Sequence, residues 1–233
     1  MKTIGLIGGL SWESSVEYYR IINEVVRAKL GGLHSAQCLM YSVDFAEIEA
    51  LMQRGEWETI TGRLIEVAQQ LKRGNAEFII ICSNTMHKMA QAIEQAVQIP
   101  LLHIVDPTAE AIQAQGFSTV ALLATGYTME QDFYKGRLSE KYGLNVLIPS
   151  QSQRDEVHRI IFEELVVGVI KPESRERYQA VIADLAAQGA QAVILGCTEI
   201  GLLIKPEHSV LPTFDTTLLH AQAAVEWALD GLI

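Results

Sequence analysis

Two segments far apart in the sequence are built on the same plan, and this duplication constrains the fold more than any other feature. Residues 191–200 read Gln-Ala-Val-Ile-Leu-Gly-Cys-Thr-Glu-Ile, and residues 77–87 read Glu-Phe-Ile-Ile-Ile-Cys-Ser-Asn-Thr-Met-His. In each segment a short apolar run, rich in β-branched residues and too short for a helix, leads into small polar residues. We interpret both runs as buried strands that end in a polar loop before a helix.

Other parts of the chain repeat in the same order. Residues 99–109 and 210–218 each give a Pro, a short strand, an Asp, a Thr and a helix, and residues 3–9 correspond to 119–126. The repeat predicts two similar α/β halves, 1–116 and 117–233, rather than a short-period solenoid. Strands that alternate with helices at these lengths indicate a mostly parallel sheet in each half.

The remaining elements are read from apolar periodicity and from helix stop signals. In the first half, we expect strands at 3–7 and 37–43. We expect three helices there: one that begins near Ser14, one that follows Asp44 and ends near Arg54, and one over 57–71. In the second half, we expect strands at 119–124 and 145–148 and helices at 128–142, 155–167, 172–188 and 217–229.

Composition limits the class of protein. The 233 residues are 49% hydrophobic and 20% charged, which is typical of a globular protein with a sizeable core. We expect no membrane span, because no apolar run reaches about 18 residues, and no signal peptide. The net charge of −10 argues against nucleic acid and anionic membranes as partners. Three widely spaced cysteines favour neither a metal site nor a disulfide framework, and we expect a cytoplasmic protein.

The polar loop that follows the predicted strand in residues 191–200 carries a thiol, Cys197. At the start of a helix, backbone N–H groups would favour the thiolate, although a lone cysteine is more often a small buried packing residue. The pair Gly8-Gly9 lacks the full dinucleotide fingerprint. We expect Gly9 to let backbone N–H groups approach a substrate carboxylate closely.

A duplicated fold with pseudo-two-fold symmetry would place its two loops on opposite sides of a shared cleft. Such an arrangement suits the removal of a proton from one face of a carbon and its return to the other. No phosphate-binding loop and no convincing Schiff-base lysine is present, so we predict proton transfer without a cofactor. We expect the polar loop residues to hold the substrate carboxylates: Asn84, Thr85, Thr125, Thr128 and Thr198.

These motifs together resemble the aspartate/glutamate racemases that need no pyridoxal phosphate. The resemblance covers the whole chain, through Gly8-Gly9, Asn84-Thr85-Met86-His87 and residues 196–199 (Gly-Cys-Thr-Glu). It is strongest to bacterial amino-acid racemases with Ser-Trp-Glu-Ser at 11–14 and Tyr-Thr-Met-Glu-Gln at 127–131. The resemblance implies two Rossmann-like α/β domains, an active site in the cleft between them and a homodimer. It also implies two catalytic cysteines, one from each domain.

This chain departs from the family pattern at one of those cysteines. The second maps to Cys197, but the first maps to Ser83, because Asn84 and Thr85 hold the register. Cys82 lies one residue too early and should point to the opposite face of the extended segment. A hydroxyl ionises far less readily than a thiol, so symmetric two-thiol chemistry is not expected.

Three neighbouring residues are weaker candidates. Glu199 lies beside Cys197 and is expected to bind the substrate amine, although a carboxylate is favourable in any first helical turn. His87 lies one turn after Ser83 and could face the site or form core hydrogen bonds. Lys171 is the nearest basic residue to a position where family members carry a carboxylate-binding lysine, but its alignment is not fixed.

The leading hypothesis is an isomerase that racemises aspartate or glutamate, with Cys197 and Ser83 as acid and base. Neutral amino acids remain alternative substrates. One alternative function is a one-thiol enzyme that resembles the arylmalonate decarboxylases, and another is an amino-acid-binding protein without turnover.

Overall fold

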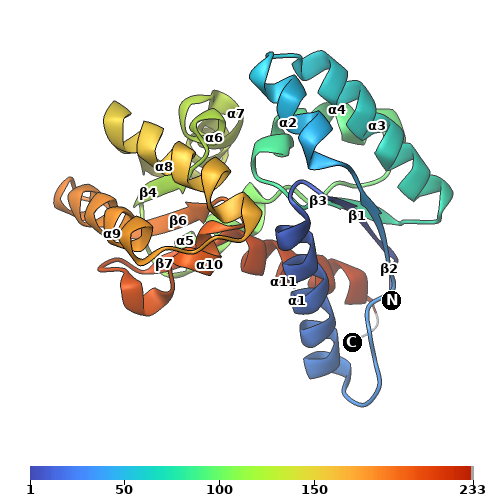
Figure 1. The fold of residues 1–233 in the computed structure, drawn as a ribbon. Coiled ribbons are helices and arrows are strands. Elements are labelled where there is room, and N and C mark those ends of the chain that lie inside the picture. The colour runs from blue at the N-terminus through green and yellow to red at the C-terminus, as the bar shows by residue number, and fades with distance from the viewer. Residues whose placement is uncertain (232–233) are drawn as a thin grey trace. The chain divides into compact units, whose positions relative to one another are not determined.

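The computed structural model describes residues 1–231, which form two compact α/β units (Figure 1). Unit 1 consists of Met1–Ile104 and the segment from His220 onward, and unit 2 consists of Val105–Leu219. Both units contain a parallel sheet, as predicted. Within residues 1–231 no helix combines the length and apolar character needed to cross a bilayer.

Unit 1 is built on a three-stranded parallel sheet in the order β2-β1-β3. Its central strand β1 and its neighbour β3 are buried along their whole length, because their continuous apolar runs are covered on both faces. The elements before the first crossing to unit 2 are β1 (Ile4–Gly8), α1 (Trp12–Leu30), β2 (Cys38–Ser42), α2 (Phe45–Gln53), α3 (Trp57–Arg73), β3 (Phe78–Ile81), η1 (Thr85–Met89) and α4 (Ala90–Val97).

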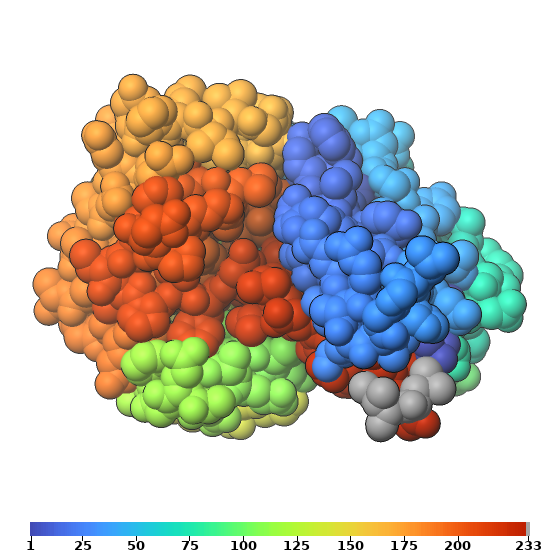
Figure 2. Space-filling model, turned by 90° about the horizontal axis from the view of Figure 1, so that it is seen from below, coloured from blue at the N-terminus to red at the C-terminus, as the bar shows by residue number. Residues whose placement is uncertain are grey.

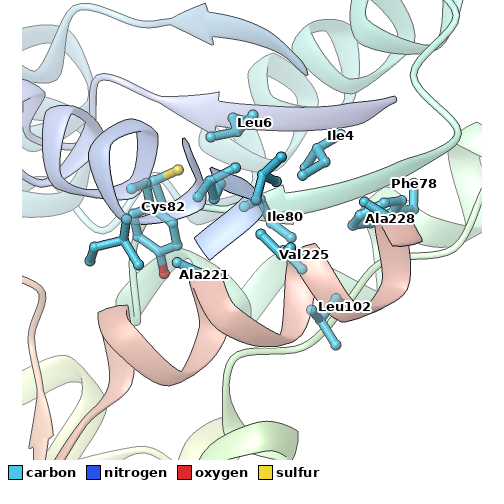
Figure 3. Packing of buried hydrophobic residues seen from close by; sticks show 14 of the residues in the cluster. Ile4, Leu6, Phe78, Ile80, Cys82, Leu102, Ala221, Val225 and Ala228 are labelled. Carbon is cyan, nitrogen blue, oxygen red and sulfur yellow. The ribbon is translucent and has the colours of Figure 1, made fainter. Parts of the chain in front are cut away.

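The last helix, α11 (Thr216–Leu229), completes the core of unit 1. Its buried Ala221 and Val225 pack with Ile4 and Ile80 of the sheet and with Tyr18 of α1, as the close-up in Figure 3 shows for the labelled residues. Burying each large aliphatic side chain contributes about 1.5–3 kcal/mol to folding. The C-terminal helix is therefore part of the first sheet's core and does not belong to the second half of the chain.

Unit 2 is built on a four-stranded parallel sheet in the order β5-β4-β6-β7. The central strands β4 and β6 are apolar, and β6 is buried throughout. Its elements are α5 (Val105–Ala114), β4 (Thr119–Ala124), α6 (Gly126–Glu130), α7 (Asp132–Gly136), η2 (Arg137–Lys141), β5 (Asn145–Leu147), α8 (Gln151–Glu163), η3 (Leu165–Val167), α9 (Pro172–Ala187), β6 (Ala192–Gly196), α10 (Ile200–Leu203), η4 (Pro206–His208) and β7 (Thr213–Asp215).

The boundaries differ from the predicted division at 116/117. Helix α5 packs on β7 of unit 2, and the end of α11 packs on unit 1, so the chain crosses between units at 104/105 and again at 219/220. The predicted helix 128–142 is broken between α6 and α7, where Gln131 adopts an extended conformation (φ −93°, ψ 151°), and α7 continues into the π-helical turn η2. The strand expected after Ile99 is reduced to one bridge between Ile79 and Leu101.

The surface of unit 1 carries several apolar side chains. Val16 and Tyr19 of α1 are about half exposed, and Leu33 in the following loop is fully exposed. This N-terminal segment is blue in the space-filling view of Figure 2. Val16 and Tyr19 lie three residues apart on one face of α1, and none of these three is a predicted site residue.

Candidate active site

Each unit gathers its predicted site residues at the carboxyl edge of its own sheet. In unit 1, Ile7 pairs with Ile81, so the Gly9 loop and the Ser83 loop begin at neighbouring points. In unit 2, Ala124 pairs with Gly196, so Thr125 and Cys197 follow neighbouring strand ends. Ligands of open α/β sheets bind at this edge. Each unit therefore has its own group of predicted site residues at the carboxyl edge of its sheet.

In unit 1, the Ser83 loop is a polar turn between β3 and η1. Ser83, Asn84 and Thr85 are 9%, 3% and 5% exposed, so the turn is largely enclosed. The Met86 N–H donates to Ser83 Oγ at 3.5 Å, a long contact that leaves the Ser83 hydroxyl proton available. The hydroxyl can therefore donate to a ligand that reaches it.

Gly9 is required in unit 1 for a reason different from the expected one. Its φ is +78°, and a Cβ atom there would lie 2.2 Å from the Val43 carbonyl oxygen. The Gly9 N–H donates to Ser15 Oγ at 2.8 Å. The close approach is thus between two backbone segments, and a contact between Gly9 and a substrate stays a prediction.

Cys82 is a core residue. It is fully buried in the cluster formed by β1, β3, α1 and α11, as Figure 3 shows, and burial raises the pKa of its thiol. A buried thiol among aliphatic side chains is held neutral and is a poor base. Its packing agrees with the predicted orientation away from the Ser83 face.

His87, which had two open interpretations, is buried and hydrogen-bonded to the backbone. Its Nδ1 lies 2.7 Å from the Ser83 carbonyl oxygen, and the Ile104 N–H donates to its Nε2 at 3.1 Å. Because the main chain engages both ring nitrogens, His87 forms core hydrogen bonds, and neither nitrogen is left to bind a substrate.

In unit 2, Cys197 and Glu199 form a hydrogen-bonded pair. The Cys197 thiol donates to Glu199 Oε2 at 2.9 Å, and the Thr198 hydroxyl donates to the same oxygen at 2.8 Å. Glu199 is 2% exposed and Cys197 is 9% exposed, so the pair is enclosed but within reach of a small ligand. The Glu199 carboxylate therefore accepts two hydrogen bonds, one from the Cys197 thiol and one from the Thr198 hydroxyl.

This pairing reverses the expected effect on the thiol. Burial raises the pKa of Cys197 well above its ordinary value of 9.0, and the neighbouring Glu199 charge and hydrogen bond raise it further. Helix α10, which was expected to favour the thiolate, spans only Ile200–Leu203. A helix of one turn has a small dipole, whereas a full negative charge lies in contact with the sulfur, so the carboxylate dominates.

Short-range contacts also occupy the threonines of unit 2. Thr125 caps α6, accepting from the Thr128 N–H at 3.3 Å, and the two hydroxyl oxygens lie 3.2 Å apart. The Thr198 proton is directed to Glu199. The loop containing Thr125 and Thr128 is thereby ordered before a ligand arrives, which is the preorganisation that tight binding needs.

Two residues near Cys197 were not found from the sequence. The buried Tyr178 phenol donates to the Val157 carbonyl at 3.3 Å, and its pKa is raised well above 10.0 by burial and by the charges of Cys197, Glu164 and Glu199. Buried Glu164 accepts from Ser174 Oγ at 2.6 Å. No short motif links these positions, because helices α8 and α9 bring them together only after folding.

Lys171 forms an ion pair with Glu164 within unit 2. Its Nζ lies 3.4 Å from Glu164 Oε1, and Arg159 reaches the same carboxylate oxygen at 3.2 Å. The lysine therefore neutralises a buried carboxylate of its own unit. Residues 1–231 contain no group of three or more His, Cys, Asp or Glu side chains suited to a metal ion.

Comparison with known proteins places this geometry in a family. The sequence profile of the Asp/Glu/Hydantoin racemase family matches residues 7–224. A candidate Asp/Glu racemase from Yersinia pestis is 53% identical, with a TM-score of 0.91 over 98% of this chain and all of the other. An aspartate racemase homologue from Pyrococcus horikoshii OT3 is 36% identical, with a TM-score of 0.83 over 98% of this chain and 99% of the other.

A further relative agrees with this assignment. The broad specificity amino-acid racemase RacX of Bacillus subtilis is 25% identical over 70% of this chain and 69% of its own length. The chain belongs to the Asp/Glu/Hydantoin racemase family and is an isomerase of the racemase class.

Proposed function

We propose that the protein is a cofactor-independent amino-acid racemase that acts on aspartate or glutamate, with Cys197 and Ser83 on opposite sides of the substrate Cα. The observation that carries this proposal is the hydrogen bond from the Cys197 thiol to Glu199 Oε2, at the edge of the sheet where ligands bind. A thiol whose proton already has an acceptor can deliver a thiolate when the substrate is in place.

The proposed reaction removes a proton from one face of Cα and adds one to the other. Glu199 takes the Cys197 proton, and the thiolate then takes the Cα proton of the substrate, which leaves a carbanion and a neutral thiol. Ser83 Oγ–H donates its proton to the opposite face of the carbanion and recovers one from water, and Glu199 releases the proton it accepted to water, so all three residues return to their starting state. The positive α-ammonium group of the substrate, bound near Glu199, would offset the negative charge that opposes the thiolate.

Substrate choice rests on the polar loops and on the relatives. Asn84, Thr85 and the threonines of unit 2 offer neutral donors that suit carboxylates. Relatives that match this chain are named glutamate racemase and aspartate racemase homologue, and RacX has broad specificity. We therefore favour acidic amino acids, with neutral amino acids as the next class to try.

The two halves of the reaction should not be equally easy. The hydroxyl of Ser83 ionises far less readily than a thiol, so removing a proton with Ser83 is the harder step. We propose that Cys197 faces the proton of the L-enantiomer. The enzyme should then exchange the Cα proton of L-aspartate faster than it inverts L-aspartate.

Incubation with L- and D-aspartate and with L- and D-glutamate in deuterated buffer tests the proposal. A racemase gives deuterium at Cα and both enantiomers, whereas a binding protein gives neither. Release of carbon dioxide from an arylmalonate, without amino-acid exchange, would identify a decarboxylase instead. Cys197→Ala should abolish exchange, and Ser83→Cys should raise inversion, with about tenfold for each 1.4 kcal/mol of barrier removed. Retained exchange in Cys197→Ala would exclude Cys197 as the base.

Two further expectations accompany this function. Thermal shifts with L-aspartate or L-glutamate should exceed those with leucine or lysine, and equal shifts would remove acidic amino acids as the favoured class. We also propose a homodimer, which sedimentation analysis of the purified protein would test.

A further inference from the structure

His87 occupies the centre of a buried histidine cluster in unit 1. Its ring lies against the rings of His103 and His220, with centroids 4.6 Å and 5.5 Å away. All three side chains are at most 9% exposed. The His220 Nδ1 lies 2.8 Å from the Tyr18 hydroxyl, and its Nε2 lies 2.9 Å from the Leu102 carbonyl. These contacts connect η1, α1 and α11 with residues 102–103, just before the chain first leaves unit 1.

The hydrogen-bond partners of His87 determine its tautomer. The Ile104 N–H can only donate, so Nε2 must accept and carries no proton. The ring proton of neutral His87 is therefore on Nδ1 and is donated to the Ser83 carbonyl oxygen at 2.7 Å. Burial, and then the charges of His103 and His220, lower the pKa of His87 well below its ordinary value of 6.5, which agrees with a neutral ring.

The two bonds join the Ser83 residue to a fixed point of the sheet. Leu102 N–H donates to the Ile79 carbonyl at 3.0 Å, so the segment that contains Ile104 is held against β3. His87 thus links the Ser83 carbonyl to the Ile104 N–H, and through that segment to the edge of β3.

We propose that His87 is a positioning residue for Ser83, whose carbonyl it clamps to the Ile104 amide so that the Ser83 hydroxyl points at the substrate Cα. This inference rests on the proposed racemase function, in which Ser83 transfers a proton. Proton transfer depends steeply on geometry, and a displacement of about 1 Å can cost about a hundredfold in rate. Because His87 does not touch the substrate, its loss should affect the Ser83 step and leave the Cys197 step intact.

Three substitutions separate the two bonds. In His87→Asn, the side-chain amide N–H can take the place of Nδ1–H and keep the bond to Ser83. In His87→Gln, the amide oxygen can take the place of Nε2 and keep the bond to Ile104 alone. His87→Ala removes both, and His34→Asn, at an exposed histidine in the same unit, is the matched control.

The measured quantity is the ratio of inversion to Cα-proton exchange for L-aspartate in deuterated buffer. We expect His87→Ala and His87→Gln to lower this ratio about tenfold or more, with exchange itself within about threefold of wild type. His87→Asn should recover most of the ratio, and His34→Asn should not change it. Equal loss of exchange and inversion, or an unchanged ratio in His87→Ala, would overturn the positioning role.

A measurement on the unmodified protein covers the case in which the variants fail to fold. With ¹⁵N-labelled histidine, ring-nitrogen chemical shifts distinguish Nδ1–H from Nε2–H, and the variants that fold identify the His87 signal. We expect His87 to remain neutral and Nδ1-protonated from pH 5 to pH 8. An Nε2–H tautomer, or protonation of His87 in this range, would refute the clamp. Absence of exchange in the wild type, by contrast, would refute the racemase function itself.

Discussion

Replacing Glu199 by Gln should make the Cys197 thiol more acidic and the enzyme slower. The carboxylate lies 2.9 Å from the sulfur and raises the thiol pKa, so its removal lowers that pKa. The same carboxylate is the proposed acceptor of the thiol proton, which an amide cannot replace. A more acidic thiol with less activity is the opposite of what a simple nucleophile argument predicts.

The size of the effect follows from Coulomb's law. Two unit charges about 4 Å apart interact by ~4 kcal/mol at an effective dielectric constant of about 20. Both side chains are at most 9% exposed, so solvent screening removes little of this energy. The loss of this charge favours the thiolate, so we expect the Cys197 pKa in Glu199→Gln to lie below that of the wild type.

Alkylation by iodoacetamide as a function of pH measures this change, with mass spectrometry of the peptide that contains Cys197. Cys38→Ser removes the half-buried competing thiol and serves as the background. Glu207→Gln, at an exposed glutamate of the same unit, is the control for the loss of one charge and should leave the pKa unchanged. An unchanged or raised Cys197 pKa in Glu199→Gln would show that the carboxylate does not govern the thiol.

Three other perturbations test the surrounding structure. Cys82→Ala should retain Cα-proton exchange, and lost exchange would make Cys82 a catalytic candidate again. Because the substitution removes a buried sulfur, it should lower the free energy of unfolding, measured in urea, by about 1–2 kcal/mol. Gly201→Ala should cost about 1–3 kcal/mol, because its Cβ would lie 2.4 Å from Asp215 Oδ2, whereas Gly62→Ala, in open space on α3, should stabilise by about 0.5–1 kcal/mol. Folding lowers the pKa of His87, so the unfolded state takes up a proton first and stability should fall as the pH drops below about 6.5, by up to ~1.4 kcal/mol per pH unit. His87→Asn should reduce that slope, and an unchanged slope would assign it to other groups.

The sequence was most informative where chemistry and strand ends coincide. The apolar run predicted as a strand within residues 77–87 forms β3, and the strand predicted at 119–124 has its observed bounds, because β-branched runs flanked by polar turns have few alternative structures. The same pattern placed Ser83 and Cys197 after buried strands. Side-chain alternation predicted that Cys82 points away from the face that Ser83 uses, and the full burial of Cys82 in the core of unit 1 agrees with this prediction.

The missed features depend on contacts between distant segments. The neutral His87 needs the Ile104 amide, 17 residues away, and the local sequence left its role open. Burial, and then the contact of Glu199 with the sulfur, raise the pKa of Cys197, whereas the sequence indicated only a helix N-terminus. The unit boundary was misplaced because helix periodicity does not specify which sheet a helix covers.

The return of the chain to unit 1 at His220 has a consequence for biosynthesis. Unit 2 is one continuous stretch, Val105–Leu219, and can complete its contacts as soon as it has left the ribosome. Unit 1 cannot, because Ala221, Ala224 and Val225 of α11 are synthesised after the whole of unit 2 and fill the space against α1 and β3. The strands that emerge first must therefore wait, with an apolar face open, until α11 has been synthesised. Vectorial synthesis thus lets unit 2 close before the N-terminal sheet, and the stage before α11 emerges is when a chaperone would be needed most.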